Sequence, residues 1–336
     1  SITVYNSGTG QTTVAVEKNF DLIRPTLTSI DISSNNSNNT EYATTDDVIT
    51  ISVSSATSQD LGNAARWSKT IQNQGASVNI VGGDATITST VGASHSDGPC
   101  EFLFRVYDPY GNPSLATYSQ VIGTSTVTID KTPPVVTVGI SSDNEFYSTR
   151  SKESDVITVT IDAGGEIINV PTVTIANKNA TEAPTATSDS FTATYTMASG
   201  ETQGVISVAV TNITDLAGNP SAISSVNVND GSQVIHDSVA PTLSVVNIES
   251  DNNNPMWAKS EDLVTVEIRS NNDEALQTPV GTIDGQAASE TPKNINNNYE
   301  YLITKTMNPS ITEGDLNCTV DFMDLSGNAG TQITDA

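Results

Sequence analysis

Few of the side chains that usually carry chemistry occur in this sequence. Its 336 residues include only 2 cysteines, 2 histidines and 13 lysines and arginines, and aromatic residues make up 5%. Phosphate binding needs clustered Lys and Arg, so the formal charge of −26 argues against a nucleic-acid partner. The same charge favours solubility and cation binding, although a plain solvated acidic surface explains most of it.

Long hydrophobic runs are also missing. No apolar stretch approaches the roughly twenty residues that cross a bilayer, so no membrane segment is predicted in this chain. Ser1 does not begin a signal peptide, and we expect any export signal or anchor to lie outside this segment. Helical periodicity is absent, while apolar residues alternate with Thr, Ser and Asn, which predicts an all-β fold.

The two cysteines are expected to be buried thiols rather than a disulfide. Cys100 alternates with Phe102 and Phe104, so a period of two places the three side chains on one face of a strand. Cys318 aligns in the same way with Phe322. Because these are equivalent strands of different repeats, the two thiols are not expected to meet.

The two histidines are expected to be exposed loop residues. His95 lies in the polar run Ser94-His95-Ser96-Asp97, and His236 precedes an aspartate in a linker. A nucleophile, a base and an orienting group must converge in space, and sequence neighbours on a loop rarely do so. No enzyme, and no catalytic or cofactor-binding residue, is predicted.

One short motif occurs three times. The pattern D-x-x-G-N stands at 108–112, 215–219 and 324–328, at steps of 215 − 108 = 107 and 324 − 215 = 109 residues. Two further landmarks keep the same order and step: D-x-x-x-P begins at Asp21, Asp130 and Asp237, and an Asp followed by an alternating apolar run stands at 47, 155 and 262. The unit of the chain is therefore a domain of roughly a hundred residues, repeated in tandem.

These landmarks predict three domains behind a short N-terminal segment. Ile49, Ile51 and Val53 fall on one side of their strand, and a strand with one apolar face must pack against a second sheet. About seven short strands per repeat, separated by turn clusters, are typical of a β-sandwich. The predicted architecture is a rod of tandem Ig-like β-sandwiches: an N-terminal strand segment at 1–21, then domains at 22–130, 131–237 and 238–336.

The motifs carry a resemblance to a known family. The run 208–220, with Asp130-Lys131-Thr132-Pro133-Pro134 before it, resembles the tandem bacterial Ig-like (Big-type) repeats of large cell-surface adhesins and extracellular fibre proteins. The resemblance covers nearly the whole chain, and the first repeat departs most, at 92–99 and in its Asp-Pro-Tyr corner. It implies that the acidic corner closes the last hairpin of a domain, that the D-x-x-x-P linker opens the next, and that the protein is extracellular or on a cell surface.

The repeat does not close at the ends of the chain. From Asn112 to Asp130, and from Asn219 to Asp237, there are 18 residues, but only 336 − 328 = 8 follow Asn328. The third domain is therefore expected to lack its last strand, while Thr12, Val14 and Val16 form a strand with no domain of its own. Either this strand fills the third domain of another copy, or the segment belongs to a longer tandem array. The expected partners are copies of the chain itself or flanking repeats.

Acidic and amide side chains are expected to gather where two domains meet, because the turn after the first strand and the last corner lie at opposite poles of an Ig-like fold. Such oxygen ligands suit Ca²⁺. The structural alternative is that they only cap their own turns. The candidate ligands are Asp46, Asp47, Asp130, Asp215 and Asn219 for one junction, and Glu153, Asp155, Asp237, Asp324 and Asn328 for the other.

Two classes of function remain open. The first is a structural repeat unit of an extracellular filament or stalk. The second is an adhesin module, stiffened by calcium, that binds a glycan or protein; its candidate surface is Trp67 with the insertion at 92–99. Asn35 and Asn38 lie in a polar loop and are the most plausible glycosylation acceptors.

Overall fold

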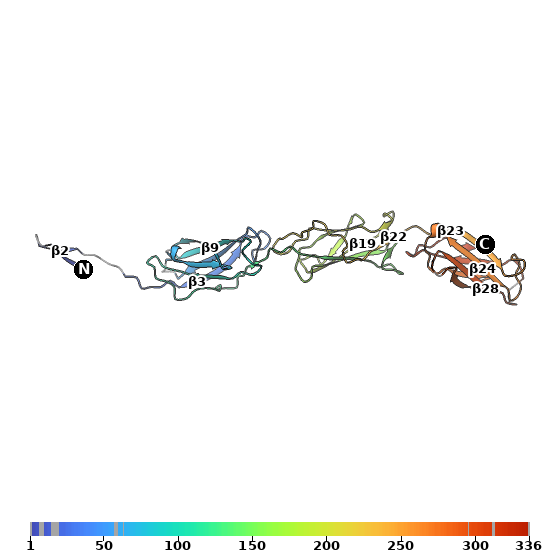
Figure 1. Ribbon diagram of the computed structural model, residues 1–336, viewed down its shortest axis with the longest axis horizontal. Helices are drawn as coiled ribbons and strands as arrows, with labels where there is room; N and C mark the ends of the chain where they lie inside the picture. Colours follow the sequence, from blue (N-terminus) through green and yellow to red (C-terminus); the bar gives the residue numbers. More distant parts are fainter. Residues whose placement is uncertain are drawn as a thin grey trace. The chain divides into compact units, whose positions relative to one another are not determined.

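The computed structural model describes residues 20–56, 60–62, 64–294, 296–310 and 313–334, and the backbone alone of 2–6 and 10–14. The protein is almost entirely β, with two short 3₁₀ turns, η1 (Ala64–Arg66) and η2 (Asn271–Asp273). It divides into unit 1, made of 1–133 and 214–220, and unit 2, made of 134–213 and 221–336. Figure 1 shows three groups of strands along the chain.

The N-terminal segment forms a hairpin. β1 (Ile2–Asn6) pairs antiparallel with β2 (Gly10–Val14), and the register places Val4 opposite Thr12 and Ile2 opposite Val14. Thr12 and Val14 therefore lie on a strand, as predicted. Val16 lies outside the described residues.

Unit 1 contains the first sandwich. Its larger sheet has the order β3-β5-β9-β8, with β3 (Leu27–Ser34), β5 (Val48–Ser55), β9 (Asp84–Thr90) and β8 (Ser77–Val81). The second sheet is β11-β6-β7, with β11 (Phe102–Arg105), β6 (Ser68–Ile71) and β7 (Gln74–Gly75). A third sheet, β10-β12-β4, has β10 (Gly98–Pro99), β12 (Thr128–Ile129) and β4 (Tyr42–Ala43).

The core of this sandwich follows the predicted alternation. Ile49, Ile51 and Val53 are buried, and Phe102 and Phe104 face them from the second sheet. Cys100 packs against the same cluster, and burial raises the pKa of its thiol to about 12. Both cysteines are free, as predicted, and Cys318 is buried.

Unit 2 contains two further sandwiches with the same plan. The second has β13-β15-β19-β18, with β13 (Thr137–Ser142), β15 (Val156–Asp162), β19 (Ser190–Thr196) and β18 (Thr181–Ala183). Facing it is β17-β16-β21, with β17 (Lys178–Asn179), β16 (Thr172–Ile175) and β21 (Val208–Thr211). Its third sheet is β14-β22-β20, with β14 (Arg150–Ser151), β22 (Ile235–His236) and β20 (Gly204–Val205).

The third sandwich has only two sheets among the described residues. One is β23-β24-β28-β27, with β23 (Leu243–Ser250), β24 (Leu263–Ser270), β28 (Glu300–Thr306) and β27 (Ser289–Pro292). The other is β26-β25-β29-β30, with β26 (Gln286–Ala287), β25 (Val280–Ile283), β29 (Cys318–Asp321) and β30 (Ile333–Thr334). The three-stranded sheet seen in the other two sandwiches has no counterpart in the described part of the third.

The middle strands of the three-stranded sheets, β12 and β22, close their sandwiches. β12 runs parallel to β4, where Asp130 N donates to Ala43 O at 2.9 Å, and β22 runs parallel to β14, where Asp237 N donates to Ser151 O at 2.8 Å. Ile129 and His236 occupy the same place in these two closing strands and are fully buried.

The expectation that both histidines are exposed is wrong. His95 folds back over its own loop, and its Nδ1 accepts from Gly92 N at 3.1 Å. His236 is buried because it stands at the inward position of a closing strand, with Ser151 Oγ 3.1 Å from its Nδ1. Burial lowers the pKa of His236 below its ordinary value.

Each sandwich has a separate core, so a core defect is expected to stay local. Ile51→Ala removes a fully buried side chain and should destabilise the first sandwich by about 2–5 kcal/mol. Hydrogen exchange should therefore speed up in β5 and β9 while β15 and β24 keep their protection. Leu115→Ala, at an exposed site, is the control and should change nothing. Equal loss of protection in all three sandwiches would contradict separate cores.

Candidate functional site

The D-x-x-G-N corners are the most regular features of the fold. In corner 2 (215–219), Asp215 Oδ1 accepts from Asn219 N and Asp215 Oδ2 accepts from Asn219 Nδ2, both at 2.8 Å. Corner 1 (108–112) and corner 3 (324–328) repeat both bonds at 2.7–2.9 Å. The corner carboxylate therefore holds the corner asparagine in one orientation, as the turn-capping alternative expects.

That orientation directs the corner asparagine at the linker. Its Nδ2 donates to the backbone carbonyl of the aspartate that begins D-x-x-x-P: Asn112 to Asp21 O at 3.1 Å, Asn219 to Asp130 O at 3.0 Å and Asn328 to Asp237 O at 2.9 Å. The first and third sequence landmarks of each repeat thus touch, and the linker has the same anchor three times.

A second asparagine, which we call the turn asparagine, stands in the turn after the first strand of each sandwich. Asn36, Asn144 and Asn252 are spaced by 144 − 36 = 108 and 252 − 144 = 108 residues. In each, Oδ1 accepts from backbone N–H groups of the turn, and Nδ2 donates at 2.7 Å to a carboxylate of the next strand, on Asp47, Asp155 and Asp262 respectively.

Two of the three turn asparagines make one more bond. Within unit 1, Asn36 Nδ2 also donates to Ala217 O of corner 2 at 2.8 Å, and within unit 2, Asn144 Nδ2 donates to Ser326 O of corner 3 at 3.0 Å. Ala217 and Ser326 are 0% and 1% exposed as a result. Among the described residues, Asn252 makes no such bond and is only half-buried.

Glycine is required in corners 2 and 3 by this close approach. Gly327 has a φ of 82°, and a Cβ built on it would lie 2.7 Å from Phe146 Cε2. A Cβ on Gly218 would lie 1.9 Å from Asn38 Nδ2. The turn of one repeat therefore fits directly over the corner of the next.

The predicted calcium ligands fall into two groups. Asp47 and Asp155 cap their own turns, where Asp47 Oδ2 accepts from Thr44 N and Asp155 Oδ2 accepts from Lys152 N, both at 2.8 Å. Asp46 and Glu153 are exposed beside these turns. These four carboxylates are therefore not gathered into one cluster.

The linker and corner aspartates do come together. In unit 1, carboxylate oxygens of Asp130 and Asp215 lie within 4.8 Å of each other. Burial raises the pKa of Asp130, and the negative charges of Asp215 and Asp97 raise it further. Asn219 and Asn328, the predicted amide ligands, use Nδ2 to bind the linker carbonyl.

The equivalent site in unit 2 gains a third carboxylate. Oxygens of Asp237, Glu274 and Asp324 lie within 4.8 Å of one another. Burial raises the pKa of Asp324, against the hydrogen bonds from Asn328, and Asp237 raises it further. Burial, with the charges of Asp237 and Asp324, likewise raises the pKa of Glu274. Like charges are thus held together at a cost that a bound cation relieves.

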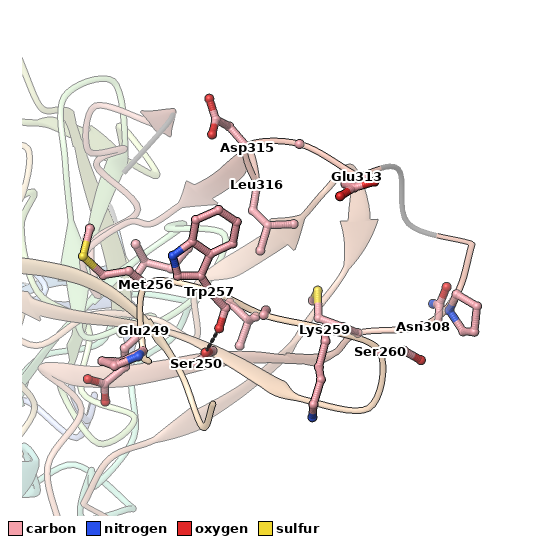
Figure 2. Close-up of a pocket in the computed structure, with 17 residues that line it drawn as sticks. Glu249, Ser250, Met256, Trp257, Lys259, Ser260, Asn308, Glu313, Asp315 and Leu316 are labelled. Carbon is pink, nitrogen blue, oxygen red and sulfur yellow. Dashed lines mark hydrogen bonds between the residues drawn. The ribbon is translucent and has the colours of Figure 1, made fainter. Parts of the chain in front are cut away.

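The third sandwich has a groove where the other two have a closing strand. This groove, the open slot, has a volume of about 850 Å³ and runs between 257–258 on one side and 314–316 on the other. Position 258 corresponds to Ala43 of β4 and Ser151 of β14, and 314–315 correspond to β10 and β20. Figure 2 shows Trp257 at one wall of the slot and Asp315 and Leu316 at the other.

The surface proposed for an adhesin is not available. Trp67 is buried, stacks on Phe104 with ring centroids 6.4 Å apart, and donates from Nε1 to Gly62 O at 3.0 Å. The sequence gave no sign of this, because a lone tryptophan in a polar stretch is equally typical of a surface. His95 fills the insertion at 92–99 from within.

The two glycosylation candidates differ in their surroundings. Asn35 is exposed, and its Oδ1 accepts from Val48 N at 2.6 Å. Asn38 is exposed, but its Nδ2 packs beside Gly218, so a glycan on that nitrogen would compete with corner 2 for the same space.

The pair formed by Ser151 and His236 resembles a nucleophile and base only in composition. Both side chains are buried within the closing-strand layer of the second sandwich. A substrate cannot reach them without removal of that strand, so the pair has a packing role.

Sequence reasoning missed the turn asparagines and Glu274. The asparagines keep the same step as the other landmarks, so the repeat itself would have revealed them. Glu274 follows η2, belongs to no repeated motif, and joins the cluster only through the folded position of its loop.

Comparisons with known proteins agree on the kind of fold. A structure of titin domains I67–I69 shares 12% identity, 93% coverage of this chain and 96% of its own, at a TM-score of 0.35. The fibronectin(III)-like modules of Clostridium thermocellum CbhA share 12% identity over 58% of this chain and 90% of theirs, at 0.31, and a marsupial T cell receptor shares 10% over 91% and 98%, also at 0.31. These scores carry no argument beyond the sheet topology above.

No protein-family model and no curated protein matches the chain. The described residues include no helix that is long and apolar enough to span a membrane. The chain is a set of tandem Ig-like β-sandwiches.

The turn around Asn252 allows an acid test. Hydrogen bonds from Asn252 and Lys259 lower the pKa of Asp262 to about 2 from 3.8. Its stabilising effect is therefore complete above about pH 4 and lost as the pH falls towards 2. Asp262→Asn should lower the unfolding midpoint of β24, followed by hydrogen exchange, at pH 7, and the difference from the wild type should vanish near pH 2. The exposed Glu261→Gln should have no effect, and a pH-independent difference would contradict the assignment.

Proposed function

We propose that this chain is a structural repeat unit of an extracellular filament or stalk, and that copies assemble head-to-tail by strand complementation. The observation that carries the proposal is the open slot. Two sandwiches of the same plan hold a closing strand where the third has a groove. An open edge with an uncovered core costs free energy, so a strand supplied by another molecule is favoured there.

The hydrogen-bonding groups of the slot fit such a strand. In the first sandwich, Thr128 N donates to Glu41 O and Cys100 N donates to Val127 O, both at 2.8 Å. The equivalent groups in the third sandwich are Met256 O and Leu316 N, and neither has a hydrogen-bond partner among the described residues. An added strand would satisfy both.

The N-terminal segment has the sequence of such a strand. Val14-Ala15-Val16-Glu17-Lys18 resembles Val127-Thr128-Ile129-Asp130-Lys131, the closing strand of the first sandwich. Thr12, Val14 and Val16 are the side chains proposed to face the core of the neighbouring copy. Because a donor and an acceptor lie in every copy, each addition leaves a new free end, and the assembly does not close.

The family resemblance supports the setting. Tandem bacterial Ig-like repeats are parts of surface adhesins and fibre proteins, and the corner and linker motifs that carry this resemblance meet in all three repeats. An acidic chain with two unpaired cysteines is compatible with an extracellular position. The proposed location is therefore outside the cell or on its surface.

Removal of residues 1 to 21 tests the proposal. The shortened chain should keep its β circular-dichroism spectrum and sediment as a monomer, whereas the full chain should form species that grow with concentration. A control lacking only residues 1 to 6 keeps the donor strand and should still assemble. Assembly that survives the longer deletion would contradict strand complementation.

A second proposed function is that of a module stiffened by calcium, within an adhesin that binds a glycan or protein. The cluster of Asp237, Glu274 and Asp324 favours the calcium part, because it supplies only oxygen ligands and carries pKa values raised by mutual repulsion. The residues fit part of a Ca²⁺ shell, which takes about six to eight oxygens.

Thermal melting with Ca²⁺ and with a chelator tests the calcium site. Ca²⁺ should raise the melting temperature of unit 2, and the increase should shrink as the pH falls, because protonated carboxyls are poor ligands. Glu274→Gln should reduce the increase. An identical melting temperature under both conditions would contradict calcium binding.

A further inference from the structure

We propose that corner 1 and Phe20 of one copy dock on the turn asparagine and open slot of the third sandwich of another copy, reproducing between molecules the contact that the chain makes twice within itself. This inference rests on the proposed function and deepens it, because it assigns the residues of the two surfaces.

The two internal junctions define the contact. Each has a closing strand that passes through a sandwich, and a corner whose third residue accepts a hydrogen bond from a turn asparagine. The corner asparagine binds the linker carbonyl directly after the closing strand. Strand, linker and corner therefore dock as one rigid piece.

Unit 1 carries the same piece with nothing on it. Asn112 binds Asp21 O just as Asn219 binds Asp130 O. The third residue of corner 1 is Tyr110, which is 75% exposed, whereas Ala217 and Ser326 are buried. No described residue donates a hydrogen bond to the Tyr110 carbonyl.

Phe20 fixes the register of the incoming strand. It stands one residue before the anchored linker aspartate, where the closing strands have Ile129 (0% exposed) and His236 (1% exposed), yet Phe20 is 83% exposed. An aromatic ring at this place is an inward residue without a core. The period of a strand puts Phe20 on the same face as Val14 and Val16.

Unit 2 carries the complementary surface. Asn252 has one Nδ2 bond, to Asp262, where Asn36 and Asn144 have two. Beside it, the open slot exposes the apolar side chains of Met256 and Trp257. When Phe20 enters the slot, Asp21 N can donate to Ala258 O, as Asp130 N does to Ala43 O.

The occupant is a second copy because each missing partner of one surface is present, uncovered, on the other. The free amide hydrogen of Asn252 matches the free carbonyl of Tyr110, and the slot matches the exposed ring of Phe20. The pairing Asn252–Tyr110 repeats the pairings Asn36–Ala217 and Asn144–Ser326.

Two single variants and their mixture test the assignment by sedimentation velocity. Phe20→Asp damages only the donor surface, and Asn252→Ala damages only the acceptor surface. Each variant alone should associate at least tenfold more weakly than the wild type. Their 1:1 mixture should form heterodimers that stop at two chains, because only one intact surface of each kind remains. Val135→Asp, at an apolar site that is 81% exposed, is the control and should assemble like the wild type.

The outcomes separate this inference from the proposed function. Assembly by Phe20→Asp at wild-type strength, together with loss of assembly on removal of residues 1 to 21, would overturn the register while strand complementation stands. A mixture that does not restore dimers would overturn the pairing of these two surfaces. A wild type that stays monomeric at all concentrations would overturn the proposed function as well, and would favour a further repeat of a longer chain as the occupant. Melting curves show whether Asn252→Ala still folds; if it does not, Leu316→Asp replaces it as the acceptor variant, with the same outcomes.

Discussion

The hydrogen bond from the corner asparagine to the linker carbonyl is the constraint on which the repeat depends. Its donor is oriented by two bonds to the corner aspartate, and its acceptor is the backbone of a residue about ninety positions earlier. Such a bond fixes where the linker leaves one sandwich and enters the next. The closing strand ends at that point, so its inward residue is fixed too.

The turn asparagine adds a second constraint at the other pole. Its side chain satisfies backbone donors of its own turn, a carboxylate of the next strand and a carbonyl of the following corner. A fully used amide of this kind is buried in Asn36 and Asn144, and the loss of one of its partners leaves a polar group that favours a new contact. This is why the half-buried Asn252 indicates a docking surface rather than an ordinary turn.

Most of the fold could be predicted from the sequence, because a period of two and a repeated corner each have one structural solution. Ile49, Ile51 and Val53 show the first, and the three corners show the second. The candidate site was harder. Asp47 and Asp155 satisfy their own turns, which the residue types allowed, whereas Glu274 reaches the acidic cluster only through tertiary structure. Trp67, His95 and His236 are buried by strands or loops that the local sequence does not identify.

The central claim is that the third sandwich is completed by another copy of the chain, and electron microscopy of the purified protein tests it most directly. The account predicts unbranched filaments that lengthen with protein concentration and whose axial repeat is three sandwiches. Isolated particles of three sandwiches at every concentration would contradict it.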